Sequence, residues 1–306
     1  MKIASSFLVK PHDKVKLGSL RTKIHTGVKD EHAASDVVKQ HRKQLEDLQE
    51  IFYATQQNSI LVVLQGMDTA GKDGTIRHIF SGINPQGCDV ASFKVPTPIE
   101  QRHDFLWRCH QQVPARGIIG IFNRSHYEDV LSPRVHGQIT KKTARERMQQ
   151  INDWEQMLVE NGTVVLKFFL HISQEEQTER LQARIDTPEK HWKLSPSDFS
   201  ERLYWDGYVE AYEDILRHTS KKHAPWFVIP ADHKWYRDVA VSKVLLETMQ
   251  SLKMKMPKPQ FDPTGLNLDK ETPEAIALKV KMRVNKGAVE AEHDSLTAGG
   301  GERGSR

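Results

Sequence analysis

The feature that most restricts the fold of this chain is an apolar segment that runs directly into a glycine-rich turn. Residues 59–65 are Ser-Ile-Leu-Val-Val-Leu-Gln, and residues 66–74 are Gly-Met-Asp-Thr-Ala-Gly-Lys-Asp-Gly. An unbroken apolar run of this length is typical of a strand that is buried on both faces of a parallel sheet. The Gly66-x4-Gly71-Lys72 spacing, which follows this strand and precedes a helical pattern, indicates a phosphate-binding loop.

Four further apolar runs and the segments between them extend this pattern. The runs are residues 90–95, 118–122, 164–172 and 226–230, and the predicted helices are 34–53, 72–82, 98–112, 140–160, 173–185 and 201–218. Ser173 and Glu176 have the spacing of a capping box at the start of one helix. Buried strands that alternate with helices indicate a right-handed, doubly wound α/β domain. We therefore expect a mostly parallel sheet with helices on both faces.

The two ends of the chain differ from this central α/β pattern. Residues 1–33 are basic and lack clear periodicity, which predicts an extended N-terminal arm. The α/β domain is expected to cover residues 34–256. Residues 257–306 form a C-terminal tail that starts with a proline-rich stretch and closes with the glycine-rich segment 298–306. Because that closing segment has little apolar surface to bury, we expect it to be disordered.

Composition excludes several classes of protein. A chain of 306 residues with 38% hydrophobic and 27% charged residues is typical of a soluble globular protein. Its formal net charge of +4 is too small for bulk nucleic-acid binding, but it allows a local basic surface for a polyanion. No apolar run approaches the ~18–20 residues of a membrane span, and the N-terminus lacks a signal-peptide pattern. Cys88 and Cys109 lack the spacing of a metal site, so we expect a cytoplasmic protein.

The glycine-rich turn carries the groups that phosphate binding requires. Its backbone N–H groups and the following helix N-terminus attract an anion, and Lys72 can reach a terminal phosphate. Asp73 stands where a Ser or Thr usually ligates Mg²⁺, and Asp68 places a carboxylate beside the phosphates, where a metal ion or a proton must offset repulsion. The turn could instead simply close an ordinary βα unit. The turn residues expected to bind phosphate or nucleotide are Gly66, Met67, Thr69, Ala70, Gly71, Asp73 and Gly74.

A second polar turn follows the third apolar run. Residues 122–129 are Phe-Asn-Arg-Ser-His-Tyr-Glu-Asp. If this strand neighbours the first, its carboxyl end faces the glycine-rich turn. Asn123 would then contact bound phosphate or nucleotide, Arg124 would neutralise charge on a transferring phosphoryl group, and Glu128 would bind or orient Mg²⁺. The alternative is a helix start that Ser125 caps and Glu128 completes as a capping box.

A basic segment after the fourth run has the pattern of a lid. Arg180 and Arg184 stand four residues apart on one helical face, and Pro188 then breaks the helix. Lys190 and Lys193 follow on either side of His191 and Trp192. A mobile segment that carries cations over a phosphate site can exclude water when it closes, so we predict a helical lid at about residues 184–200. A solvated charged helix followed by an irregular loop is the alternative.

Together these segments resemble the polyphosphate kinase 2 family. The similarity rests on residues 66–74, 122–129 and 189–196, with shorter familiar stretches at 84–87, 92–94, 103–108, 224–226 and 234–238. It covers roughly residues 9 to 252. The resemblance implies a thymidylate-kinase-like P-loop fold with three layers, and an enzyme that moves phosphate between inorganic polyphosphate and nucleotides with Mg²⁺, or with Mn²⁺ in its place. In this family an Asp-containing loop is the normal form. Glu128 resembles the class III branch, which phosphorylates both AMP and ADP.

The resemblance also implies roles for individual residues. The implied catalytic set is Asp68, Lys72, Arg124, Glu128, Arg180 and Arg184, and the implied metal ligands are Asp68 and Glu128. A basic groove for polyphosphate would include Lys94, Arg102, Lys190 and Lys193. Transfer of a terminal phosphoryl group to AMP or ADP, giving ADP or ATP, would be direct and in line, with catalysis by positioning and charge neutralisation. By the same analogy we expect a homo-oligomer, either a dimer or a tetramer.

Two other functions fit parts of the pattern. An ATP-dependent nucleoside or nucleoside monophosphate kinase of thymidylate-kinase-like fold would share the loop, but it needs an adenine-donor pocket that the sequence does not identify. A non-catalytic binder of nucleotide or polyanion would also share the loop. The joint presence of Asp68, Lys72, Arg124 and Glu128 argues against the binder, because simple binding does not require those carboxylates.

Overall fold

The centre of the fold is a sheet whose strands lie in the order β1-β6-β5-β2-β4-β3. The computed structural model describes residues 3–284, and the chain divides after Lys255 into two units, of which the first contains the sheet. β1 pairs antiparallel with β6, and all other neighbours are parallel. The strands are β1 (Leu8–Val9), β2 (Ser59–Gln65), β3 (Cys88–Ser92), β4 (Ile119–Asn123), β5 (Thr163–His171) and β6 (Trp226–Pro230).

β2 occupies the middle of this sheet because all seven of its residues are buried. It lies between β4 and β5, and its register pairs Leu64 with both Asn123 and Phe168. The carboxyl ends of β2 and β4 therefore meet at one edge of the sheet. The two polar turns that follow these strands begin side by side, as the sequence predicted.

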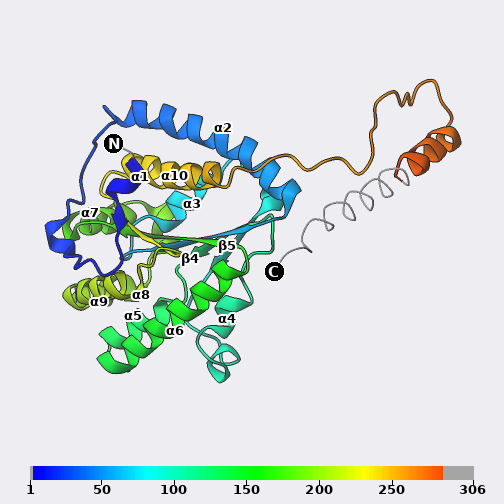
Figure 1. The fold of residues 1–306 in the computed structure, drawn as a ribbon. Coiled ribbons are helices and arrows are strands. Elements are labelled where there is room, and N and C mark those ends of the chain that lie inside the picture. The colour runs from blue at the N-terminus through cyan, green and yellow to red at the C-terminus, as the bar shows by residue number, and fades with distance from the viewer. Residues whose placement is uncertain (1–2, 285–306) are drawn as a thin grey trace, which may run out of the picture. The chain divides into compact units, whose positions relative to one another are not determined.

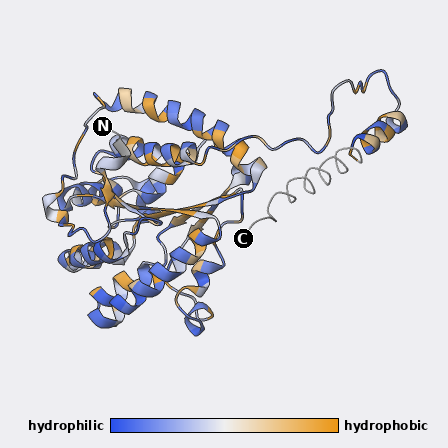
Figure 2. Cartoon of the chain, viewed as in Figure 1, coloured by the Kyte–Doolittle hydropathy of each residue, from blue (hydrophilic) through white to orange (hydrophobic). Residues whose placement is uncertain are grey.

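Helices cover both faces of the sheet (Figure 1). α2, α3 and α10 lie on one face, and α5, α6 and α9 lie on the other. Hydrophobic residues line the strands between these layers, while the outward helix faces are largely hydrophilic (Figure 2). The helices are α1 (Ile3–Ser6), α2 (Glu31–Thr55), α3 (Lys72–Phe80), α4 (Trp107–His110), α5 (Glu128–Val135), α6 (Lys141–Glu160), α7 (Gln174–Ile185), α8 (Pro196–Ser200), α9 (Trp205–Thr219) and α10 (Lys234–Ser251).

Short 3-10 turns complete the first unit, at Leu17–Ser19, Pro85–Gly87, Glu100–Arg102, Pro188–Lys193 and Glu201–Tyr204. The three-layer α/β architecture expected from the sequence is confirmed. Among residues 3–284, none of the helices combines the length and the apolar character that a membrane crossing needs.

The predicted helix at residues 98–112 is wrong. This segment contains only one 3-10 turn and the single helical turn α4. Thr97 and Glu100 exchange hydrogen bonds between side chains and backbone, and the Asp104 carboxylate accepts from the N–H of Leu106. Such local side-chain bonds offer the backbone an alternative to a continuous helix.

The capping box predicted at Ser173 and Glu176 forms only in part. The Ser173 hydroxyl accepts from the N–H of Glu176, as expected. The reciprocal bond is absent among the described contacts, because the Ser173 N–H donates to Asp232 at 2.9 Å and Glu176 instead pairs with Arg180. The start of α7 is therefore tied to the turn after β6.

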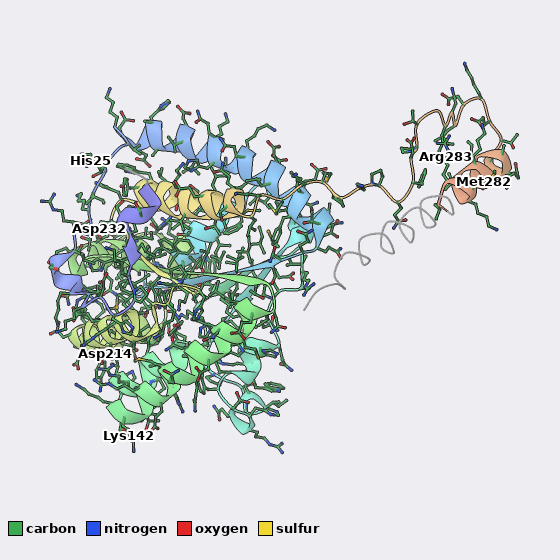
Figure 3. All side chains as sticks on the ribbon, viewed as in Figure 1. His25, Lys142, Asp214, Asp232, Met282 and Arg283 are labelled. Carbon is green, nitrogen blue, oxygen red and sulfur yellow. The ribbon has the colours of Figure 1, made fainter. Side chains whose placement is uncertain are left out.

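The N-terminal segment is more structured than an extended arm. Its strand β1 extends the sheet, the side chain of Leu17 is 1% exposed, and Thr22 donates to Asp232 at 2.6 Å. Figure 3 marks Asp232 within the first unit. α2 begins at Glu31, where the Asp30 carboxylate caps the helix by accepting from the N–H of Ala33.

The second unit begins at Met256, and its described part contains one helix at residues 273–284. The Arg283 guanidinium, marked in Figure 3, donates to the carbonyl of Thr264 at 2.9 Å and thereby joins this helix to the preceding turn. The closing segment 298–306, which the sequence predicted to be disordered, lies outside the described residues.

Candidate active site

A cleft of about 640 Å³ opens where the turns after β2 and β4 meet. Lysine and arginine side chains that line it outnumber the aspartates ten to three, so the cleft is strongly cationic. The ten cations come from α3, the segments that follow β3 and β4, α7, the adjoining 3-10 turn, and α10. They are Lys72, Arg77, Lys94, Arg124, Arg180, Arg184, Lys190, Lys193, Lys234 and Arg237.

The glycine-rich turn has the backbone shape of an anion cradle. Gly66 and Gly71 have φ angles of +152° and +102°, which favour glycine. A Cβ atom at Gly66 would lie 2.7 Å from the carbonyl oxygen of Leu170, so only glycine fits there without movement. Gly71 precedes α3 without any side-chain cap. The first N–H groups of α3 are therefore available to an anion.

Lys72 lies folded over this turn. Its Nζ donates to the carbonyl of Gly66 at 2.9 Å and lies 3.4 Å from that of Met67. Burial lowers the pKa of Lys72, and Arg124 lowers it further, while the carboxylates of Asp68 and Glu128 oppose this change. An arriving phosphate would offer Lys72 a charged acceptor in place of neutral carbonyls.

Arg124 and Asp68 join the two turns directly. Nη2 of Arg124 lies 3.0 Å from Oδ1 of Asp68, and both side chains are partly exposed to the cleft. Arg124 has a φ of +62°, an uncommon backbone conformation for a non-glycine residue, and its N–H donates to the carbonyl of Leu64 at the end of β2. Beside this pair, Asn123 donates to Asp73 at 2.6 Å. The sequence-predicted meeting of the two turns is thus seen in side-chain contacts.

Glu128 lies behind Arg124, at the first position of α5 and outside the cleft lining. Burial raises the pKa of Glu128, whereas the charges of Arg124 and Lys72 hold it down. The alternative capping box does not form. The Ser125 hydroxyl accepts from the N–H of Tyr127, and no side chain caps α5.

Arg180 is occupied by protein acceptors. Its Nε donates to Glu176, Nη1 donates to the carbonyls of Thr69 and Ala70, and Nη2 donates to the carbonyls of Ala231 and Asp232. A guanidinium has five N–H donors, and these five contacts use all of them. This geometry gives Arg180 the role of holding the glycine-rich turn to the segment after β6, with no donor left for a substrate.

The predicted lid residues line the far side of the cleft. Arg184 lies 4.0 Å from the carboxylate of Asp198, at the start of α8. Lys190 and Lys193 come from the 3-10 turn Pro188–Lys193, where the Lys193 ammonium lies 5.0 Å from the ring centroid of Trp192. The Trp192 ring is 79% exposed, so this segment has little packing to hold it in one position.

Other predicted site residues fall into two groups. Lys94, Thr69 and Gly74 line the cleft, whereas Arg102 is exposed and outside it. Gly66, Met67 and Ala70 are buried and do not line the cleft. Eight residues of the lining were not among the predicted site residues, namely Arg77, His78, Ser92, Phe93, Ala183, Asp198, Lys234 and Arg237. The available signal was the Lys-Trp-Tyr-Arg-Asp stretch at 234–238, to which no role was assigned.

The donor set suits a hard divalent cation. Within residues 3–284, no three His, Cys, Asp or Glu side chains converge as a ready-made metal site. Mg²⁺ is usually held by one or two carboxylates together with substrate phosphates, and it prefers oxygen ligands. Asp68 opens onto the cleft and Glu128 lies near it, so these carboxylates fit the ion, and its binding stays a prediction.

The fold and the cleft define a P-loop kinase-like protein, with an anion cradle between a central strand and a helix. The family model of polyphosphate kinase 2 matches residues 28–257. The chain belongs to the polyphosphate kinase 2 family, as its motifs indicated. The crystal structure of polyphosphate kinase 2 from Arthrobacter aurescens TC1 matches with a TM-score of 0.83 and 38% identity, over 92% of this chain and 97% of that one.

Two curated relatives extend the comparison. The AMP/ADP-polyphosphate phosphotransferase of Meiothermus ruber is 52% identical over 228 residues, which cover 74% of this chain and 85% of the relative. The ADP-polyphosphate phosphotransferase of Rhodopseudomonas palustris is 46% identical over 271 residues, which cover 84% of this chain and 94% of the relative.

Proposed function

We propose that this protein transfers the terminal phosphoryl group of inorganic polyphosphate to AMP and ADP, giving ADP and ATP. The observation that carries the proposal is the charge of the cleft, where ten lysines and arginines face three aspartates around an anion cradle. Such a site suits two phosphate-bearing substrates at once, because the chief barrier to their reaction is mutual repulsion. The names of the two curated relatives support the same activity.

Different residues of the cleft take different roles in an in-line phosphoryl transfer. The amides of the glycine-rich turn and Lys72 bind the phosphates at the start of α3. Arg124, which Asp68 holds at 3.0 Å, neutralises charge as it develops on the transferring group. Lys94, Lys190 and Lys193 extend the cationic lining along the path of the polyphosphate chain. Catalysis is by positioning and electrostatics, and no side chain becomes phosphorylated.

Mg²⁺ would be held by Asp68 and Glu128 together with substrate phosphates. When bound, the ion supplies charge neutralisation between the phosphate oxygens. Burial raises the pKa of Glu128, and the charges of Arg124 and Lys72 oppose that rise. Chelation by EDTA should stop turnover, and Mg²⁺ or Mn²⁺ should restore it.

The acceptor range is proposed to include both AMP and ADP, as in class III enzymes. The Meiothermus ruber relative carries both acceptors in its name, whereas the Rhodopseudomonas palustris relative carries ADP alone. The decisive assay offers AMP and ADP separately with polyphosphate and Mg²⁺, followed by chromatography of the products. ATP from ADP, and ADP then ATP from AMP, is the expected result. Product from AMP alone, or from ADP alone, would limit the proposed acceptors to that one nucleotide.

The competing kinase reading is tested in the same experiment. AMP and ATP without polyphosphate should give little ADP, and robust ADP formation would favour an ATP-dependent nucleoside monophosphate kinase. Lys72→Met, purified in the same way, controls for contaminating kinases and should lose about 100-fold or more of the activity. Asp68→Asn tests the non-catalytic alternative, because unchanged activity would remove the role assigned to that carboxylate.

Location and assembly complete the proposal. We expect a cytoplasmic homo-oligomer, either a dimer or a tetramer, by analogy with the family. Light scattering of the purified protein checks the assembly, since a mass near the 35.1 kDa of one chain would contradict it.

A further inference from the structure

A buried arginine of α10 lies against the glycine-rich turn and is used by none of the steps above. The Arg237 side chain is 1% exposed, yet it reaches the lining of the cleft. Its Nε donates to Oδ1 of Asp238 at 2.8 Å. Nη2 lies 2.7 Å from the same oxygen, but among the described residues it has no acceptor in hydrogen-bonding geometry. A buried donor without an acceptor is rare in native proteins and calls for a missing partner.

The guanidinium faces the first turn of α3. A Cβ atom built on Gly71 would lie 2.0 Å from Nη1 of Arg237, and one built on Gly74 would lie 3.4 Å from Nη2. The two glycines therefore make the space that the guanidinium fills. A cation at a helix N-terminus is repelled by the positive end of the helix dipole. An anion that binds on the helix N-terminus beside the guanidinium offsets this repulsion.

The neighbouring charged groups also favour an anion bound beside Arg237. Arg180 has all of its donors on protein acceptors, so it cannot serve such an anion. Lys234, one turn before Arg237 on α10, also lines the cleft. Asp238 is the carboxylate that pairs with Arg237, and its other oxygen lies 2.7 Å from Nδ1 of His78. At this end of the cleft Asp238 therefore contacts both Arg237 and His78, while Glu176 pairs with Arg180.

We propose that Arg237 binds a phosphoryl oxygen of the phosphate group seated on the N-terminus of α3, and that Asp238 positions its guanidinium for this contact. The inference rests on the proposed function for the substrate class, which is a phosphate anhydride. The same contact can serve the end of a polyphosphate chain or the phosphates of a nucleotide. A guanidinium that presents two N–H groups suits a phosphate better than a single ammonium does.

Direct binding tests this proposal without turnover. Calorimetry would measure the affinity of the full-length protein for inorganic triphosphate and, separately, for ADP. Arg237→Gln should weaken binding of at least one of them by about 10- to 100-fold, the effect expected for one charge-assisted hydrogen bond. Loss for triphosphate assigns the contact to polyphosphate, loss for ADP assigns it to the nucleotide, and either result supports the proposal.

Matched variants separate binding from folding. Arg42→Gln removes a cation of α2 that bonds Ser81 outside the cleft, and it should leave both affinities within twofold of wild type. Arg237→Lys keeps the charge but loses the paired donors, so about a fivefold loss is expected. If thermal unfolding shows that Arg237→Gln does not fold, the affinities of Arg237→Lys test the proposal in its place. Asp238→Asn should raise KM more than it lowers kcat.

Several results would overturn the inference. Folded Arg237→Gln that binds both ligands within twofold of wild type would do so, as would unchanged affinities in Arg237→Lys when the glutamine variant does not fold. Wild-type protein that binds neither triphosphate nor ADP would also overturn it. Failure of the proposed function is distinguishable, because it would appear as wild-type protein that binds phosphate but forms no polyphosphate-dependent product.

Discussion

A fully buried ion pair between α6 and β5 gives the sharpest stability prediction. Glu155 of α6 and Lys167 of β5 are both 0% exposed, and Nζ of Lys167 lies 2.6 Å from Oε2 of Glu155. Oε1 of Glu155 accepts from Tyr127 at 2.9 Å and lies 3.1 Å from Nε2 of His126. We predict that Glu155→Gln destabilises the protein by about 3–5 kcal/mol at pH 7, because Lys167 then loses its counterion and must give up its proton in the folded state.

The magnitude follows from the protonation of Lys167. Glutamine keeps the shape of Glu155, so packing changes little and the loss is electrostatic. Lys167 would retain the Tyr127 hydroxyl, the Thr219 carbonyl and the neutral amide oxygen at position 155 as acceptors. Burial already lowers the pKa of Lys167, and Glu155 opposes this. Without Glu155 the folded state holds a neutral amine, whereas the unfolded chain keeps its proton up to a pKa of about 10.4. Releasing that proton costs about 4–5 kcal/mol at pH 7 but about 2 kcal/mol at pH 9.

Urea unfolding followed by tryptophan fluorescence, at pH 7 and at pH 9, measures both values. Glu146→Gln is the matched control, since its pair with Lys142 is exposed on the surface of α6 and should change stability by less than about 0.5 kcal/mol. Lys142 projects from that helix in Figure 3. A loss below about 1 kcal/mol for Glu155→Gln at pH 7, or a loss that grows toward pH 9, would refute the reasoning.

Three further predictions concern other parts of the first unit. Gly71→Ala should destabilise the protein by roughly 1–3 kcal/mol and lower kcat/KM at least tenfold, whereas Gly82→Ala, with a φ of +97° but open space around it, should affect unfolding alone. Burial and then the charge of Lys243 lower the pKa of His41 to about 4, so the folded state stays neutral while the unfolded chain takes up a proton below pH 6.5. The contribution of His41 to the free energy of unfolding is therefore lost as pH falls from 6.5 to 4, by about 2 kcal/mol at pH 5. Unfolding of His41→Gln, measured at pH 7.5 and at pH 5, should not show this pH-dependent loss. Burial raises the pKa of Cys88 to about 11 and of Cys109 to about 12, so iodoacetamide should label both slowly at pH 7.5 until urea is added, as mass spectrometry can follow.

The sequence predicted the frame of the site because that frame depends on buried strands. Residues 59–65 and 226–230 match β2 and β6 at both ends, and each run is buried at every position. The sequence predicted that the turn at 122–129 faces the glycine-rich turn if the two strands are neighbours. β2 and β4 are neighbours in register, and Arg124 lies 3.0 Å from Asp68. The sequence pattern did not predict the helix α10. It is buried on most sides, so it shows no amphipathic stripe.

The partners of long side chains could not be predicted in this way. Helical spacing places Arg180 and Arg184 on one face, and that much is correct, but spacing says nothing about which carbonyls come within reach. The order of the strands in the sheet determines which carbonyls lie within reach of Arg180. β6 lies two strands from β2, so the segment that follows β6 comes close to the glycine-rich turn, and Arg180 spans the gap between them.

The same strand order explains why two arginines have different tasks. Because Arg180 holds the turn against the segment after β6, α10 starts close enough for Arg237 to reach Gly71. An arginine whose five donors all have protein acceptors fixes geometry but has none left for substrate, whereas one with a donor that lacks an acceptor in hydrogen-bonding geometry can bind substrate. Loss of Arg180 should therefore lower stability and activity together, and loss of Arg237 should lower phosphate affinity while the fold persists. Equal effects of Arg180→Gln and Arg237→Gln on unfolding free energy would contradict this division.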